Sequence, residues 1–219
     1  MSADESIWML PVVEAPYFEG EFLAPWSVPE FEPLSMIQLH EGMSHPEVGL
    51  VMAQLAAYNH IDLENDRQTV LEQILGADSL VLPGGIEVIS QGKVIPPSCC
   101  CGLETWREWQ EFLKTGNSPW LGHDPSPWLE SDGDIVRIWS DGGLEAVKDA
   151  FYFNVSRSDF AVYLMLLEEE LRGFLIAVED WARFVDFPKH DQLFWKLDQC
   201  FDVGIRKRPF GVYSLLKWS

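Results

Sequence analysis

At 219 residues, with 47% hydrophobic residues and 13% aromatics, the chain can bury a sizeable core, which excludes an intrinsically disordered protein. Charges or prolines interrupt every apolar run before the roughly 18–20 residues of a membrane span, and the acidic start at Met1–Glu5 is unlike a signal peptide. We therefore expect a cytoplasmic protein with no membrane partner, built as a single domain over residues 1–219.

The formal net charge is −20, from 35 acidic and 15 basic residues, and the acidic residues are unevenly distributed. Residues 1–66 contain twelve carboxylates and no Lys or Arg. Such a field repels nucleic-acid backbones and steers a basic protein toward the surface. We expect a basic protein partner and no nucleic acid, with a general effect on solubility as the alternative. The short basic run Arg206–Arg208 is interpreted as a solvated loop.

Residues 1–35 are predicted to form an extended acidic and aromatic arm, because the prolines from Pro11 to Pro33 forbid a helix. The arm would pack on the body as extended chain or short edge strands. Alternatively it is a free recognition segment, in which aromatic side chains among carboxylates dock on a basic partner. The candidate partner-binding residues are Trp8, Tyr17, Trp26, Glu30 and Glu32.

Capping and turn signals predict the elements that follow. Ser44 and Glu47 have the spacing of a capping box, and Gln91-Gly92 is a plausible two-residue hairpin turn. In the first half of the chain we predict a helix from Ser44 to Tyr58 or Asn59, a helix from Asp62 or Asp66 to Gly76, strands Ile86–Ile89 and Lys93–Ile95, and a helix Leu103–Lys114. In the second half we predict strands Ile135–Trp139 and Phe151–Val155, separated by a helical stretch Leu144–Lys148. A helix from Ser156, a helix between Pro188 and Gly204, and a strand-like segment Phe210–Trp218 follow.

The most regular pattern belongs to the helix that begins after Ser156, which we expect to span roughly 28 residues. Its apolar stripe comprises Phe160, Leu164, Leu167, Leu171, Phe174, Val178, Trp181 and Val185. A stripe of this length must be covered, either by the sheet and the next helix or by a second copy in a homodimeric coiled coil. The second option would make the protein a dimerising scaffold, so both monomer and homodimer remain open. The element order predicts an α+β fold with an antiparallel or mixed sheet packed against helices.

Three consecutive cysteines, Cys99–Cys101, form the most unusual short motif. A disulfide between neighbours is disfavoured, because adjacent Cα atoms lie about 3.8 Å apart and a normal bridge spans about 4.4–6.8 Å. In an extended segment Cys99 and Cys101 share one face, so a metal site would use them with His123, or with Asp124 in its place. Alternatively Cys100 or Cys101, at the start of the next helix, is a reactive thiol. We expect tight packing between hairpin and helix instead, with no metal and no cofactor.

The turn-rich segment from Trp120 to Trp128 lies beside the cysteines in sequence. It offers a possible cleft formed by Trp120, His123, Asp124 and Trp128. Phosphate-binding, dinucleotide-binding and serine-hydrolase motifs are absent from the sequence. We therefore predict no catalytic residues and no enzymatic activity.

The stretch Cys99–Glu104 with Trp106 and Trp109, followed by Pro119–Pro125, resembles segments of uncharacterised bacterial proteins. In its acidity, tryptophan content and Gly-Gly turns, about half of the chain resembles the SUKH-type immunity proteins of bacterial toxin systems. This resemblance implies a cytosolic α+β domain and carries over no functional residue. The leading hypothesis is a non-enzymatic acidic protein-binding module, of the immunity type, that neutralises a basic toxin or nuclease.

Overall fold

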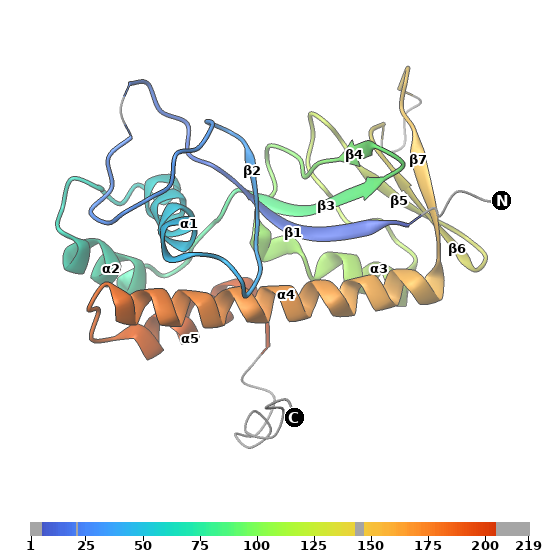
Figure 1. The fold of residues 1–219 in the computed structure, drawn as a ribbon. Helices are drawn as coiled ribbons and strands as arrows, with labels where there is room; N and C mark the ends of the chain where they lie inside the picture. The colour runs from blue at the N-terminus through green and yellow to red at the C-terminus, as the bar shows by residue number, and fades with distance from the viewer. Residues whose placement is uncertain (1–5, 21, 143–146, 205–219) are drawn as a thin grey trace.

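The computed structural model describes residues 6–20, 22–142 and 147–204. The basic run Arg206–Arg208 and the predicted strand-like segment Phe210–Trp218 lie outside the described residues, as does most of the predicted helical stretch Leu144–Lys148. Within the described ranges the chain forms helices and two antiparallel sheets, so the α+β prediction is confirmed. Figure 1 shows both sheets lying along one long helix, α4 (Arg157–Phe184), which runs nearly the length of the molecule.

The first sheet has the strand order β2-β1-β3-β4. Its strands are β1 (Trp8–Glu14), β2 (Met36–Gln38), β3 (Gly84–Ser90) and β4 (Lys93–Ile95). Ser90 pairs with Lys93, and Gln91 and Gly92 both adopt positive φ, at 52° and 73°. These dihedrals are those of a type I′ turn, so the predicted hairpin is confirmed.

Strand β1 pairs on both sides, with β2 and with β3, although prolines are usually confined to edge strands. Pro11 is tolerated because the pairing with β2 ends beside it. The Leu39 amide donates to the Pro11 carbonyl at 2.9 Å, so the carbonyl of Pro11 points toward the β2 side of the sheet. The nitrogen of Pro11 points to that side too, at a position beyond Gln38, the last paired residue of β2, where β2 needs no hydrogen-bond donor. Residues 8–14 therefore occupy an interior position of the sheet, where the sequence predicted an arm or an edge strand.

The second sheet has the order β5-β6-β7. Its strands are β5 (Trp128–Asp132), β6 (Ile135–Trp139) and β7 (Tyr152–Ser156). The last two match the predicted strands to within a residue. Strand β5 was not predicted, because Trp128–Asp132 has one apolar and three polar residues after its tryptophan and follows a cluster of turn formers. Its pairing with β6, in which Trp128 lies opposite Trp139, supplies the stabilisation that its own pattern does not indicate.

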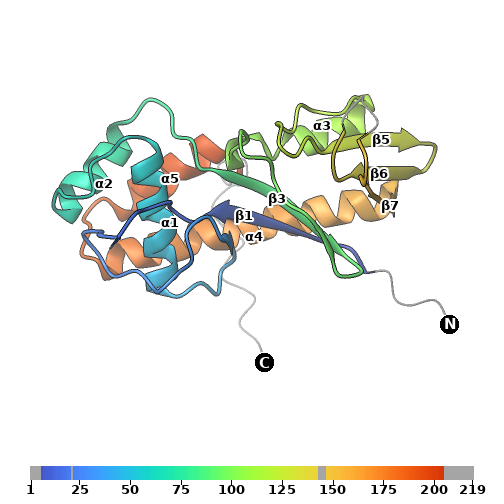
Figure 2. The same ribbon diagram turned by 90° about the horizontal axis from the view of Figure 1, so that it is seen from above.

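Helix α1 (His45–Tyr58) begins with the predicted capping box. The Glu47 amide donates to Ser44 Oγ, and the Ser44 amide donates to the Glu47 carboxylate at 2.7 Å. Helix α2 (Arg67–Gly76) begins at Asp66, whose carboxylate accepts from the amides of Gln68 and Thr69. In Figure 2 these two helices and α5 (His190–Phe201) surround one end of α4, and the second sheet covers the other end.

The apolar stripe of α4 is buried throughout by the chain itself. Each predicted stripe residue is less than 10% exposed, and α4 packs against α1, α3, α5 and strand β1. The alternative of a coiled-coil dimer along this stripe is therefore excluded, because no part of the stripe is free for a second copy.

The predicted single helix Leu103–Lys114 is divided in two. A 3₁₀ turn spans Leu103–Thr105, and helix α3 begins only at Glu108 and ends at Thr115. Trp106 and Arg107 lie between the 3₁₀ turn and α3, and their side chains form hydrogen bonds with residues much later in the sequence. The Trp106 indole donates to the Phe201 carbonyl at 2.7 Å, and Arg107 donates to the Val203 carbonyl and to the Glu168 carboxylate, each at 2.8 Å. These bonds fix the segment that leads out of the cysteines.

Candidate functional site

The three cysteines lie in a β-turn rather than in an extended segment. The Cys101 amide donates to the Ser98 carbonyl at 3.3 Å and closes a four-residue turn, which we call the cysteine turn (residues 98–101). Cys99 and Cys100 occupy its two central positions and are both exposed. The end of the turn is anchored to the first sheet, because the Gly84 amide donates to the Cys101 carbonyl at 3.3 Å.

A neighbouring loop segment, residues 121–125, bends at 123–125 and packs directly against the cysteine turn; we call it the histidine bend. Ser98, only 4% exposed, donates its hydroxyl to the His123 carbonyl at 2.7 Å. Gly122 adopts a φ of +93°, and a Cβ there would lie 2.0 Å from Ser98 Oγ. Only glycine allows the two turns to approach this closely.

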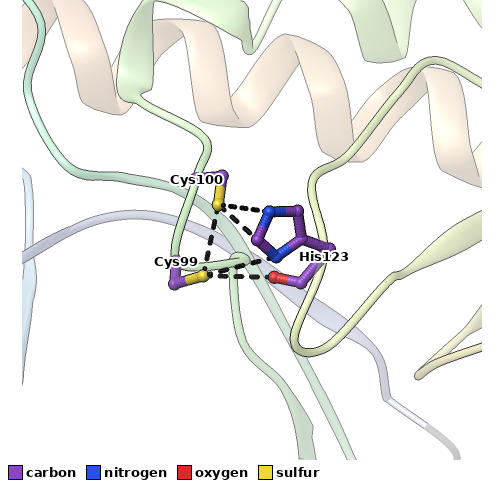
Figure 3. A group of neighbouring side chains, drawn as sticks. All are labelled: Cys99, Cys100 and His123. Atoms are coloured by element: carbon purple, nitrogen blue, oxygen red, sulfur yellow. Dashed lines mark hydrogen bonds between the residues drawn. The ribbon is translucent and has the colours of Figure 1, made fainter.

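The contact between the turns brings together Cys99, Cys100 and His123, which we call the Cys–His cluster (Figure 3). Cys99 Sγ and Cys100 Sγ are 3.3 Å apart, and Cys100 Sγ lies 3.1 Å from His123 Nε2. Cys99 Sγ lies 4.0 Å from His123 Nδ1 and donates to the His123 carbonyl at 3.2 Å. Among the described residues, these three form the group whose donor atoms converge closely enough for one metal ion.

The imidazole of His123 is also contacted by the neighbouring residue of the chain. Its Nδ1 lies 3.2 Å from a carboxylate oxygen of Asp124. Cys100 Sγ lies 3.1 Å from Nε2 and 3.6 Å from Nδ1, so the sulfur sits over the ring and not along the lone pair of either nitrogen. With Nδ1 protonated and donating to Asp124, Nε2 keeps its lone pair. In this tautomer Nε2 is the ring nitrogen available to a metal ion.

The third cysteine is separated from this cluster, which corrects the set Cys99, Cys101 and His123 given as the alternative metal site in the sequence analysis. Cys101 is buried, and burial, followed by the negative charge of Glu108, raises the pKa of its thiol to about 11. The correction follows from turn geometry, since the prediction assumed the side-chain alternation of an extended segment. Ser98 at the first position and the preceding Pro-Pro favour a turn, and this signal was available in the sequence.

The reactive-thiol alternative receives no support from the local electrostatics. The pKa of Cys100 lies above its ordinary value, first because of its hydrogen bond with Cys99 and then because of desolvation. The helix that was to stabilise a thiolate begins at Glu108, whose negative charge raises the pKa of Cys101 and so opposes a thiolate there. A thiol with a raised pKa is mostly protonated at neutral pH and is a poor nucleophile.

A small cavity of about 20 Å³, close to the room that one water molecule needs, lies on the inner side of the cysteine turn. Cys101, Trp106 and Leu121 are among its lining residues. The residues proposed for a cleft are placed differently: Trp120 is 63% exposed, His123 and Asp124 face solvent, and Trp128 is in β5. None of these four lines the cavity.

The predicted partner-binding residues fall into two groups, four that are exposed and one that is buried. Trp8 and Tyr17 are 60% and 66% exposed, and Glu30 and Glu32 are exposed. Trp26 is buried, which corrects its assignment as a contact residue.

The indole of Trp26 donates to the Gly49 carbonyl of α1 at 2.7 Å and packs edge-to-face on Trp181 of α4, with ring centroids 5.0 Å apart. The sequence neighbours of Trp26 explain why it was predicted to be exposed, because Pro25 and Ser27 are typical of an exposed turn. The partner of its ring is 155 positions away in the chain, so no local pattern indicates the contact.

Comparison of the chain with family models, with curated proteins and with solved structures finds no match. No helix in the described part of the chain is both long and apolar enough to span a bilayer.

Proposed function

We propose that the protein is a non-enzymatic binding module that docks a basic protein on its N-terminal third. The observation that carries this proposal is the complete absence of Lys and Arg from residues 1–66, which contain twelve carboxylates. A surface of one sign accelerates the encounter with a partner of the opposite sign and discriminates against other partners. Nucleic acid and anionic membranes are disfavoured on the same ground.

Exposed apolar side chains in the loop between β1 and β2 supply the contacts that charge alone does not. Tyr17, Leu23 and Leu34 are 66%, 65% and 50% exposed, and the carboxylates of Glu30 and Glu32 are exposed in the same loop. Binding energy at protein interfaces is concentrated in a few aromatic and apolar anchors, and surrounding charges set the rate and the choice of partner. Tyr17 is the aromatic anchor of this loop.

The same loop is supported internally by three phenylalanines. The rings of Phe18, Phe22 and Phe31 lie with centroids 5.2–5.5 Å apart. The Ser35 hydroxyl also donates to the Glu32 carbonyl at 2.7 Å. A loop that is already ordered loses less conformational entropy on binding, which favours a docking role for it.

The more specific form of the proposal is an immunity-type protein that neutralises a basic toxin or nuclease. An inhibitor of this kind acts by covering a cationic surface, and therefore needs carboxylates and apolar anchors rather than catalytic groups. The acidic N-terminal third and the exposed Tyr17 meet this requirement.

Affinity capture at two salt concentrations tests the proposal. The immobilised protein should retain a basic protein from the source cells at about 0.05 M salt and release it at about 0.5 M salt, since the longer Debye length at low salt preserves the attraction. Tyr17→Ala should weaken the binding of that protein by about tenfold or more. Failure to retain any basic protein would contradict the proposal.

A charge-matched pair of variants separates a specific surface from overall acidity. The double variant Glu30→Gln, Glu32→Gln removes two charges from the loop, and Glu170→Gln, Asp191→Asn removes two exposed charges from α4 and α5. Association of the captured protein should slow markedly only in the loop variant. Equal slowing in both would mean that net charge alone is responsible.

A further inference from the structure

We propose that Cys99, Cys100 and His123 bind a thiophilic transition-metal ion, with Zn²⁺ as the representative ion, at the contact between the cysteine turn and the histidine bend. This site is independent of the proposed docking surface. It uses donors that converge at one exposed corner of the fold (Figure 3).

The distances between the donor atoms are close to those of a bound site. For tetrahedral Zn²⁺, with bonds of about 2.3 Å to sulfur and about 2.0–2.1 Å to nitrogen, two sulfurs lie about 3.8 Å apart and a sulfur and a nitrogen about 3.6 Å apart. The sulfurs of Cys99 and Cys100 are 3.3 Å apart, and Cys100 Sγ is 3.1 Å from His123 Nε2. The other ring nitrogen, Nδ1, lies 3.6 Å from Cys100 Sγ and 4.0 Å from Cys99 Sγ. Coordination through Nε2 requires the imidazole to rotate until its lone pair points between the two sulfurs.

The backbone that carries the donors is fixed by bonds that do not involve the donors themselves. The cysteine turn is closed between Ser98 and Cys101, and the buried Ser98 hydroxyl ties it to the His123 carbonyl at 2.7 Å. Gly122 permits the close approach. Because the site is preformed, binding a metal would require little ordering of the chain.

The carboxylate of Asp124 contacts the His123 ring and would orient it as a ligand. Histidine ligands of metals usually donate their other ring N–H to a carboxylate or a carbonyl, which fixes the tautomer and strengthens the ligand. Asp124 lies 3.2 Å from His123 Nδ1 and is placed for this interaction, which leaves Nε2 for the metal. This contact is separate from the convergence of the three donors and points to the same function.

The chemistry of the donors selects the kind of ion. Two thiolates and an imidazole favour zinc and similar soft or borderline ions, whereas Mg²⁺ and Ca²⁺ require mainly oxygen ligands. Binding displaces one proton from each thiol, so two thiolates balance the charge of one divalent ion. Three protein ligands leave a fourth position for water or for a donor from another molecule, and all three residues are exposed, so the bound ion would be open to exchange.

Titration of the reduced full-length protein with Co²⁺, followed by displacement with Zn²⁺, tests the site. We expect one ion per chain, with an intense near-ultraviolet band from thiolate-to-Co²⁺ charge transfer and visible bands of tetrahedral Co²⁺. Cys99→Ser, Cys100→Ser and His123→Ala should each lower the affinity by more than about a hundredfold, and Asp124→Asn by about 10–100-fold.

Two cysteines outside the cluster serve as matched controls. Cys101→Ala and Cys200→Ala should bind Co²⁺ with unchanged stoichiometry and spectrum, and thermal unfolding of each variant would check that it is folded. A spectrum without the charge-transfer band, or a loss of binding in Cys101→Ala equal to that in Cys100→Ser, would overturn the assignment. Failure of the protein to bind one equivalent of Zn²⁺ or Co²⁺ under reducing conditions would do the same.

Discussion

The N-terminal third of the chain and the segment 96–128 are both rich in prolines, turns and aromatic residues, yet the fold uses them in different ways. In the first region, Trp26 turns inward to α1 and α4, and carboxylates are spread along the surface. In the second, two short turns are held together by a buried serine, and donor atoms converge at one corner. Similar compositions thus give a broad charged surface in one case and a localised site in the other, because in the second region two anchored turns lie in contact and bring their donor atoms together.

The largest expected effect in this comparison comes from the tryptophans. Trp26→Ala should lower the free energy of unfolding by about 3–5 kcal/mol, because it removes a buried ring that packs on Trp181 and leaves the Gly49 carbonyl without its indole donor. Trp120→Ala, at a position 63% exposed, should cost under about 1 kcal/mol. Urea unfolding of both variants measures the difference. Similar losses of unfolding free energy in the two variants would contradict the buried packing assigned to Trp26 and the exposure assigned to Trp120.

A smaller effect should follow from separating the two turns. Gly122→Ala introduces a Cβ that would lie 2.0 Å from Ser98 Oγ, at a φ that disfavours alanine. We expect a loss of more than about 2 kcal/mol in unfolding free energy, and weaker Co²⁺ binding as the turns move apart.

Gly133→Ala is the matched control, since Gly133 also has a positive φ but a Cβ there would meet nothing within 4 Å. It should cost only about 1 kcal/mol and leave Co²⁺ binding unchanged. Equal effects of the two substitutions would show that backbone strain, rather than the contact between the turns, explains the loss.

The smallest effects concern two glutamates, one in each region, whose pKa values shift in opposite directions. Hydrogen bonds from the Ser44 side chain and backbone lower the pKa of Glu47, so its stabilising effect is present above the ordinary value of 4.5 and is lost as the pH falls. Burial raises the pKa of Glu104, so its contribution is present at acid pH and is lost as the pH rises through the raised pKa.

Unfolding free energies measured between about pH 3 and pH 8 should therefore separate the two positions. At neutral pH, Glu47→Gln should destabilise and Glu104→Gln should be neutral or stabilising, each by under about 1 kcal/mol. Both differences should shrink toward acid pH, where the wild-type carboxyls are neutral. The same sign of effect at the two positions would contradict the assigned causes.

Local signals were sufficient to predict much of the fold. The capping box at Ser44 and the stripe from Phe160 to Val185 predicted α1 and α4, and Gln91-Gly92 predicted the β3–β4 hairpin, because each depends on residues close in sequence. Strand β5 and the break at Trp106 were missed. The first is stabilised by pairing with β6, and the second by bonds to residues 201–203, so both depend on contacts that no local window contains.

The candidate site was predictable in part. His123 and Cys99 were named from the sequence, but the partner sulfur is that of Cys100 rather than Cys101. The identity of the second thiol depends on whether residues 98–101 turn or extend, and Pro-Pro-Ser before the cysteines was a local signal for a turn. The contact between Ser98 and Gly122 could not be inferred, since it requires knowledge of how two loops meet.

The interior position of β1 has a consequence for how the protein is made. Translation proceeds from the N-terminus at about 5–20 residues per second, so β1 leaves the ribosome well before the segments that complete it. Its main partner, β3, begins at Gly84, and the long helix that packs against it begins at Arg157. Strand β1 can pair with β3 once residues 84–90 have left the ribosome, but it packs against α4 only after residues 157–184 have followed. During that interval the nascent chain exposes the face of the sheet that α4 later covers.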